Sequence, residues 1–203
     1  MKTVAIIPAK SLVEAKSRLA AELPDDRRTA VALNMLRHVI AETVQTPGIA
    51  SVGVVSKDEQ ALEAARELGA MIVLEHGQGL NHALYLGRRW ALEQVGAGAL
   101  LVVLSDLPLL KTSDLTDIVA LGEHASVVIA PSKDGGTNAL LLRPPDAIPF
   151  RFGPASASRH AAEAGQRGLA AAQLQRPTLA FDVDTPEDVR TAFGASLAAV
   201  HGT

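Results

Sequence analysis

Two short loops carry residue types that could bind a phosphate-bearing ligand. The first, 134–138, has the sequence DGGTN and runs straight into an apolar segment. Its glycines let the backbone approach a ligand because no Cβ intervenes, and Thr137 and Asn138 offer a hydroxyl and a carboxamide. The second loop, 151–156, has the sequence RFGPAS and adds a guanidinium and another hydroxyl. Backbone N–H groups and hydroxyls presented in this way are suited to phosphate.

Three cations follow the first apolar segment of the chain, residues 4–7. They are Lys10, Lys16 and Arg18. Lysine acts as a point charge and arginine as a two-pronged donor, so together they could neutralise a triphosphate. The alternative interpretation is an ordinary solvated basic loop. The segment lacks the GxxxxGK[ST] pattern of a P-loop.

Three aspartates stand where an α/β sheet would bind a ligand. Asp106 follows the most hydrophobic segment, 100–104, while Asp182 and Asp184 lie in the sequence FDVDTPED. If 179–183 were a strand, residues two apart would point to one side, and crowded carboxylates repel unless a cation lies between them. Magnesium prefers carboxylate and phosphate oxygens, so we expect a magnesium site. The alternatives are a turn-forming aspartate at 106 and an acidic helix start at 184.

Several other kinds of chemistry are excluded. The chain contains no cysteine, which rules out disulfides, thiolate catalysis and cysteine-ligated metals. Its six histidines show no HxH, HxxxH or HExxH spacing, so zinc is not indicated and we expect most of them to be surface groups. Neither the GxSxG elbow of the α/β-hydrolases nor a GxGxxG dinucleotide motif is present.

The composition is that of an ordinary globular protein with an aliphatic core. The 203 residues are 48% hydrophobic and 3% aromatic, and carry a formal net charge of -3. Nucleic-acid or anionic-membrane partners are not expected, because both would require a basic surplus. Since no segment approaches the ~20 apolar residues of a membrane span, and the first residues do not read as a signal peptide, we expect a cytoplasmic protein.

Short apolar segments alternate with longer amphipathic ones along the chain. This alternation predicts an α/β fold, with a mostly parallel sheet and helices on both faces. We treat residues 1–203 as one domain and 134–175 as a small β-rich elaboration of it. The expected strands are 4–7, 52–55, 71–74, 100–104, 126–130, 137–142, 173–175 and 179–183. The expected helices are 25–43, 58–68, 80–95, 112–121, 155–166 and a last one capped by Thr185 with Pro186 at its first position.

Taken together, these segments resemble the CofC/FbiD guanylyltransferases of deazaflavin coenzyme biosynthesis. The resemblance rests on IIPAKSL at 6–12, LSDLPLL at 104–110, GGTNALLL at 135–142, RFGPAS at 151–156 and FDVDTPEDV at 181–189. It extends over essentially the whole chain, and the combination of GGTNALLL with RFGPAS is the most specific part. The opening loop alone is less specific, because sugar-phosphate and molybdopterin nucleotidyltransferases begin in a similar way.

The resemblance implies a Rossmann-like nucleotidyltransferase fold and a reaction in which a phosphorylated three-carbon acid attacks the α-phosphorus of GTP. Phosphoenolpyruvate is the favoured acid, with 2-phospho-L-lactate and 3-phosphoglycerate as alternatives, and magnesium is the implied cofactor. Two departures from the family pattern are Ser105, where alanine is frequent, and Ala155, where glycine is common. The matched positions are Thr137, Gly153 and Ser156 for the acid, Asp106, Asp182 and Asp184 for magnesium, and Lys10, Lys16 and Arg18 for the phosphates.

Gly136 and Asn138 lie beside Thr137, and we expect both to contact the acid as well. Rival interpretations are a related enzyme acting on a sugar phosphate or molybdopterin, and a nucleotide-binding regulator without catalysis. The first would favour a GxGxR-type opening, which the chain lacks. The second has no need for three clustered carboxylates. A homodimer is also compatible with the sequence.

Overall fold

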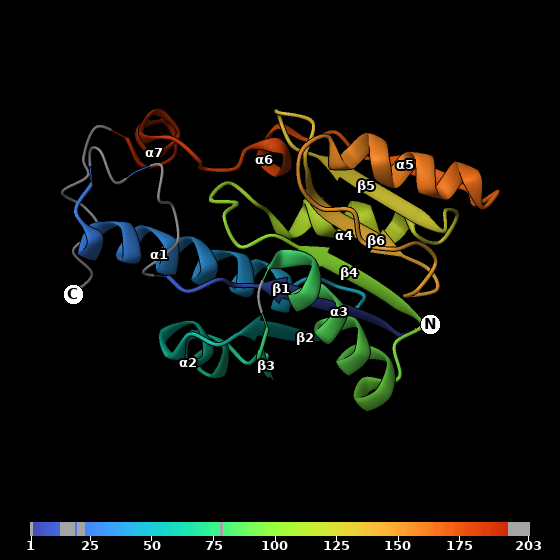
Figure 1. Ribbon diagram of the computed structural model, residues 1–203, viewed down its shortest axis with the longest axis horizontal. Coiled ribbons are helices and arrows are strands. Elements are labelled where there is room, and N and C mark those ends of the chain that lie inside the picture. Colours follow the sequence, from blue (N-terminus) through green and yellow to red (C-terminus); the bar gives the residue numbers. More distant parts are fainter. Residues whose placement is uncertain (1, 13–18, 20–22, 78, 195–203) are drawn as a thin grey trace.

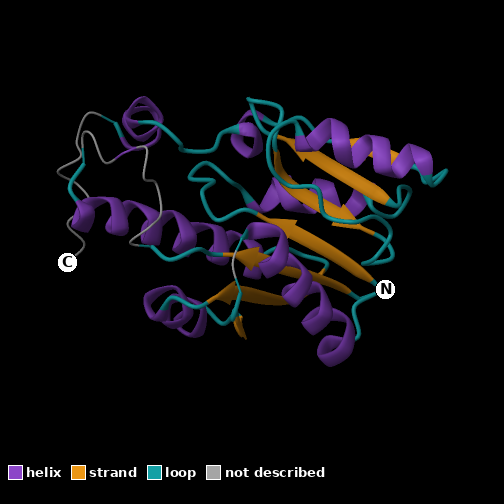
Figure 2. Cartoon of the chain, viewed as in Figure 1, coloured by secondary structure: helices purple, strands orange, loops and turns teal. Residues whose placement is uncertain are grey.

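A computed structural model describes residues 2–12, 19, 23–77 and 79–194 of the chain. Within this part, seven strands form one sheet in the order β3-β2-β1-β4-β6-β5-β7 (Figures 1 and 2). Paired strands are parallel, except that β6 runs antiparallel to β4 and β5. The strands are β1 Thr3–Pro8, β2 Ile49–Ser56, β3 Met71–Leu74, β4 Ala99–Val103, β5 Val127–Pro131, β6 Thr137–Leu142 and β7 Ala171–Gln173.

The helices connect these strands and cover both faces of the sheet (Figure 1). The third one changes from α-helix to π-helix after Trp90 and ends at Gly96, whose positive φ of 70° suits glycine. The helices are α1 Asp25–Val44, α2 Glu59–Glu67, α3 Leu80–Trp90, η2 Ala91–Val95, α4 Thr112–Leu121, α5 Ser156–Gln166, α6 Pro177–Ala180 and α7 Pro186–Phe193.

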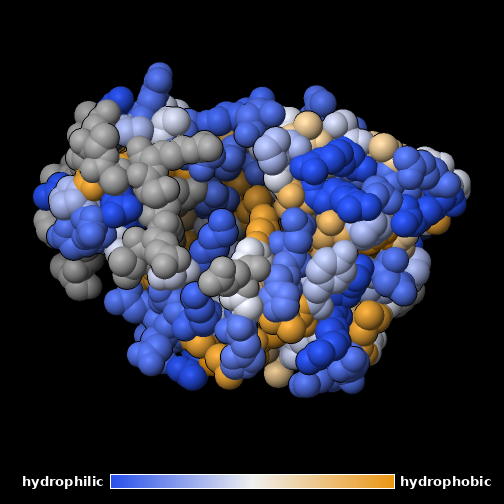
Figure 3. All heavy atoms as spheres, viewed as in Figure 1, coloured by the Kyte–Doolittle hydropathy of each residue, from blue (hydrophilic) through white to orange (hydrophobic). Residues whose placement is uncertain are grey.

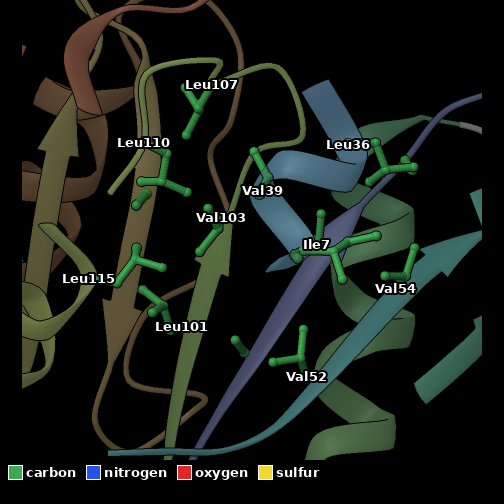
Figure 4. Close-up of a cluster of buried hydrophobic side chains, with 14 of the residues drawn as sticks. Ile7, Leu36, Val39, Val52, Val54, Leu101, Val103, Leu107, Leu110 and Leu115 are labelled. Carbon is green, nitrogen blue, oxygen red and sulfur yellow. The ribbon is translucent and has the colours of Figure 1, made fainter. Parts of the chain in front are cut away.

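Alternation along the strands sends successive side chains into two separate cores. On β1, Ala5 and Ile7 pack with residues of α1, α2 and α4, whereas Val4 and Ile6 pack with residues of α3 and α5. Figure 4 shows the first of these cores, where the side chain of Ile7 lies near those of β2, β4 and α1. Because every residue of β4 is buried, both faces of this central strand are covered, as expected for a continuous aliphatic run.

A third, smaller core attaches the last helix to the rest of the protein. Val183 and Val189 pack with Val31 and Met35 of α1. Accordingly, α7 lies beyond the sheet, near one end of α1 (Figure 1).

The face seen in Figure 3 is mostly hydrophilic, with hydrophobic residues in a strip near its centre. Among the described residues, no helix combines the length and the apolar character that crossing a bilayer requires.

Most of the predicted elements are confirmed, and one predicted strand is wrong. The bounds predicted for 71–74, 112–121 and 137–142 coincide with β3, α4 and β6. The strand predicted at 179–183 is absent, because 177–180 forms a helical turn and extended coil follows it. Within the β-rich segment 134–175, β6 lies inside the main sheet and β7 at its edge.

Candidate functional site

The predicted ligand loops converge on one edge of the sheet. The parallel strands β1, β2, β3, β4 and β5 all end at this edge, and the antiparallel strand β6 begins there. Ligands of open α/β sheets bind outside the carboxyl ends of the strands. The antiparallel insertion of β6 therefore brings Thr137 and Asn138, at the start of a strand, to the same edge as Asp106, which follows the end of one.

A cavity of about 420 Å³ lies at this edge beside β1, β2 and β3. Both polar and apolar groups line it, including Lys10, Lys57, Glu75 and the first residues of α3. The loop that carries Lys10 is held in place by Asp58, whose carboxylate accepts a hydrogen bond of 2.8 Å from the backbone N–H of Leu12. The two other predicted cations, at positions 16 and 18, lie outside the described residues.

Two of the predicted carboxylates lie close together. The backbone N–H of Val183 donates to the carbonyl of Asp106 over 3.2 Å, so Asp182 sits beside the end of β4. Burial raises the pKa of Asp182 above its ordinary value, and the negative charges of Asp106 and Asp184 raise it further. The Oδ1 atom of Asp182 is buried and accepts no hydrogen bond. This arrangement concentrates negative charge at one point.

The full trio does not form a metal-binding cluster by itself. Within residues 2–12, 19, 23–77 and 79–194, no group of three or more histidine, aspartate or glutamate side chains is placed to hold a metal ion. The expectation that Asp182 and Asp184 point to the same side of a strand also has no basis, because 181–184 is not a strand. The observations fit a cation that takes carboxylate oxygens from Asp106 and Asp182 and completes its ligands with substrate phosphate, as magnesium commonly does.

The segment 182–184 is held in position by Asp188, a residue that sequence reasoning treated only as part of a helix start. Its Oδ2 atom accepts from the backbone N–H groups of Asp184 and Thr185 and from the hydroxyl of Thr185. Its Oδ1 atom accepts from the ammonium group of Lys133, in the loop after β5. Burial alone would raise the pKa of Asp188, but the bonds from Lys133 and Thr185 lower it below its ordinary value.

The two glycines of the first loop are required by its own packing. Gly135 has a φ of +84°, which non-glycine residues rarely adopt. A Cβ on Gly136 would lie 2.6 Å from the Oγ atom of Ser132. Asp134 closes the turn by accepting from the Ser132 hydroxyl and from the backbone N–H of Gly136, which lowers its pKa. The loop therefore has a defined shape before any ligand binds.

Asn138 has a structural partner that its predicted role did not anticipate. Its side chain is 1% exposed, and its Nδ2 group donates to the carbonyl of Leu179 over 3.0 Å. This bond ties α6 to the central sheet three residues before Asp182. The geometry gives Asn138 a positioning role, and its contact with the acid stays a prediction.

The two loops predicted to bind one ligand are joined to each other. The carbonyl of Gly135 accepts from the backbone N–H of Ala157, in the first turn of α5. Next to this contact, the hydroxyls of Thr137 and Ser156 are 3.0 Å apart. His160 lies one turn further along α5 with its Nδ1 atom 3.1 Å from Thr137 Oγ1, and it is fully buried. His160 is therefore an exception to the expectation that most of the histidines are surface groups.

Asn81 connects the cavity with the second loop. Its side-chain amide donates to the carbonyl of Phe152 over 3.2 Å and accepts from the N–H of Phe152 over 3.1 Å. Asn81 is in the first turn of α3, next to residues that line the cavity. No pattern in the sequence indicates this contact, because it joins positions 71 residues apart.

The loop at 153–155 offers a stability prediction with opposite outcomes at two neighbouring sites. Ala155 adopts the left-handed conformation at a φ of 53°, which costs a non-glycine residue about 1–2 kcal/mol. Ala155→Gly should therefore raise the free energy of unfolding by about 0.5 kcal/mol, after the larger entropy of glycine in the unfolded chain is subtracted. Gly153 has a φ of +125°, so Gly153→Ala should lower it by about 2 kcal/mol. Urea unfolding of both variants tests this, and a clear loss of stability in Ala155→Gly would contradict it.

The buried histidine predicts a dependence of stability on pH. Burial, followed by the charge of Arg159, lowers the pKa of His160 to about 4, with Arg151 acting in the same direction and Glu163 opposing it. As pH falls below 6.5, the unfolded chain binds a proton that the folded protein excludes, so folded-state stability is lost between about pH 6.5 and pH 4.

We expect wild-type protein to lose about 2 kcal/mol more between pH 7 and pH 4 than His160→Asn loses. Urea unfolding at a series of pH values measures both. Equal losses would show that the imidazole does not contribute.

Comparison with solved structures defines the class of fold. A Desulfovibrio desulfuricans protein assigned as a nucleotide-diphospho-sugar transferase superposes with a TM-score of 0.76 at 17% identity, covering 98% of this chain and 91% of its own. The 4-diphosphocytidyl-2C-methyl-D-erythritol synthase of Anaerococcus prevotii superposes with a TM-score of 0.67 at 12% identity, covering 97% and 96% of the two chains. The chain has the fold of the nucleotide-diphospho-sugar transferases, as the sequence predicted.

Comparison at the level of sequence then identifies the family. Residues 3–195 match the family described as guanylyl transferase CofC like, and the chain belongs to this family. It is 47% identical to the phosphoenolpyruvate guanylyltransferase of Rubrobacter xylanophilus, over 93% of this chain and 92% of the relative. It is also 45% identical to the phosphoenolpyruvate guanylyltransferase of Sphaerobacter thermophilus, over 96% and 94%. A 2-phospho-L-lactate guanylyltransferase of Methanothermobacter thermautotrophicus is 36% identical, over 93% and 83%.

Proposed function

We propose that this chain transfers GMP from GTP to the phosphate of phosphoenolpyruvate, releasing pyrophosphate, in deazaflavin coenzyme biosynthesis. The observation that carries the proposal is the meeting of three features at one edge of the sheet. These are a cavity with cations, a pair of crowded carboxylates and two joined hydroxyl-bearing loops. Membership of the guanylyltransferase family and relatives named for phosphoenolpyruvate support this choice of reaction and substrate.

The nucleotide is assigned to the cavity beside β1, β2 and β3. Its volume of about 420 Å³ suits a small ligand. Lys10 and Lys57 would neutralise phosphate charge, including the charge that develops on the departing pyrophosphate. Lys16 and Arg18 remain predicted members of the same phosphate-binding loop.

The acid is assigned to the joined loops on the other side of Asp106. Thr137, Ser156 and the loop around Gly153 would hold it so that its phosphate oxygen faces the α-phosphorus of GTP. The phosphate monoester of the acid has a second pKa of about 6 and is mostly ionised at neutral pH. The chain therefore does not need a strong general base, and repulsion between two anionic substrates becomes the main obstacle.

Magnesium is proposed as the cofactor, with Asp106 and Asp182 as its protein ligands. Asp184 lies close enough to raise the pKa of Asp182 and adds to the negative field. The buried Oδ1 atom of Asp182, which accepts no hydrogen bond, fits a position that a cation would occupy. When bound, magnesium would offset the charge of both substrates and act as a Lewis acid on phosphate oxygens.

A direct assay tests the proposed reaction. Purified protein is incubated with magnesium, one nucleoside triphosphate and one acid among phosphoenolpyruvate, 2-phospho-L-lactate and 3-phosphoglycerate. We expect pyrophosphate release and a product with the mass of the GMP adduct of phosphoenolpyruvate. Faster turnover of another acid would change the assigned substrate. Absence of product with every acid would overturn guanylyl transfer, and turnover of a sugar phosphate or molybdopterin would favour the related enzymes.

Glu75 is the acidic residue among the described residues that line this cavity, and we propose that it selects guanine. A carboxylate is an acceptor-only group, and it matches the adjacent N1–H and N2–H donors of guanine but not the edge of adenine. Glu75→Gln should therefore raise the apparent KM for GTP about 10-fold or more, while the apparent KM for ATP stays the same. Steady-state kinetics with both nucleotides test this, with Glu123→Gln, an exposed change after α4, as the control. Equal effects on GTP and ATP would remove Glu75 from base selection.

Two further properties stay predictions of the sequence. A cytoplasmic location is proposed. A homodimer is proposed without an assigned interface, and light scattering of the purified protein measures its mass directly.

A further inference from the structure

A buried chain of polar side chains runs from α5 to β6, and no step of the proposed reaction uses its far end. Thr137, Ser156 and His160 are 3%, 1% and 0% exposed. The hydroxyl of Thr137 lies 3.0 Å from that of Ser156 and 3.1 Å from His160 Nδ1. On the other side of the ring, His160 Nε2 accepts a hydrogen bond of 3.0 Å from the backbone N–H of Arg151.

The bond from Arg151 determines the tautomer of the imidazole. A backbone N–H can only donate, so Nε2 must carry a lone pair and no proton. The ring is also neutral, because burial and the cationic side chain of Arg159 lower its pKa to about 4. A neutral ring without a proton on Nε2 carries its proton on Nδ1. His160 therefore donates to the hydroxyl oxygen of Thr137.

Counting protons shows the consequence for the two hydroxyls. The Nδ1–H of His160 and the hydroxyls of Thr137 and Ser156 are three donors, and the contacts between them use two. One O–H is left over, whichever hydroxyl carries it. With the opposite tautomer, Thr137 would donate to the ring and Ser156 to Thr137, so no donor would remain. Carboxylates and phosphates only accept hydrogen bonds from such a site, so the tautomer decides whether it attracts them.

We propose that His160 is a positioning residue whose Nδ1–H keeps the Thr137–Ser156 pair as a hydrogen-bond donor toward the anionic acid substrate. The inference rests on the proposed function, because it takes this hydroxyl pair as part of the acid site. His160 itself does not touch the acid. Its effect is exerted through the direction in which the two hydroxyl protons point.

Two substitutions separate this role from simple packing. His160→Phe keeps a ring against Phe152, whose centroid is 5.0 Å away, but removes both nitrogens. His160→Asn can place an amide N–H close to the position of Nδ1. We expect His160→Phe to raise the KM for phosphoenolpyruvate about 10-fold or more, while the KM for GTP and kcat change less than about 3-fold. His160→Asn should restore most of the affinity for the acid. An unchanged KM in folded His160→Phe, or equal rises for both substrates, would overturn the proposal.

A spectroscopic measurement tests the tautomer without any assay of activity. Imidazole nitrogen NMR of the wild-type protein labelled with ¹⁵N-histidine, assigned by comparison with His160→Asn, should show a protonated Nδ1 and an unprotonated Nε2. A proton on Nε2 would overturn the inference even if His160→Phe did not fold. Loss of guanylyl transfer is a separate outcome: wild-type protein that forms no product would overturn the proposed function and the donation to the acid, whereas the NMR measurement alone decides the tautomer of His160.

Discussion

Asp182→Asn should produce a protein that is more stable than the wild type and nearly inactive. The pKa of Asp182 is raised by burial and by the neighbouring Asp106, so its negative charge at neutral pH opposes folding. Replacing the carboxylate by a neutral amide of the same shape should therefore raise the free energy of unfolding, although solvent screening of this partly exposed side chain keeps the gain small. The same change removes the proposed magnesium ligand and should reduce kcat about 10²–10³-fold.

The two effects are measured separately, by urea unfolding and by pyrophosphate release. Asp146→Asn is the charge-matched control, because Asp146 is exposed in the loop after β6 and should affect neither quantity. Magnesium should also raise the melting temperature of wild-type protein and fail to do so for Asp182→Asn. A variant that keeps near-normal turnover would contradict the role of Asp182, whatever its stability.

Asp188→Ala should cause a larger loss of stability than any other substitution considered above. The substitution removes the acceptor of two backbone N–H groups and one hydroxyl, and it leaves Lys133 without its carboxylate. Breaking such a hydrogen-bonded ion pair should lower the free energy of unfolding by about 3 kcal/mol. Because these bonds hold segment 182–184 in position, kcat should fall about 10-fold even well below the melting temperature.

Glu187→Ala is the matched control for this prediction. Glu187 is the adjacent acidic residue in the first turn of α7, but it is exposed. If the favourable position near the helix N-terminus were the whole contribution of Asp188, both variants would lose a similar amount of less than about 1 kcal/mol. A large difference in unfolding free energy between them would assign the effect to the bonds with Lys133 and the backbone.

The gap between sequence and structure is clearest at the last predicted strand. Segment 179–183 is apolar apart from Asp182, and its composition alone is equally compatible with a strand or a short helix. In the structure its first two residues end the helical turn 177–180 and the rest is coil, with the buried amide of Asn138 bonded to the carbonyl of Leu179. Local propensity could not predict this helical turn, because the contact that stabilises it comes from a residue 41 positions away.

By itself the sequence determined the α/β class, most of the elements and the family, because periodic burial and characteristic loop sequences are local properties of a chain. It also located the glycine loop and the carboxylate of Asp106. Only the tertiary structure decided that β6 enters the sheet antiparallel, that Asp188 holds the segment of Asp182, and that His160 is buried against Thr137. Each of these depends on contacts between distant segments, and such contacts are set by how elements pack together rather than by the residues next to them in sequence.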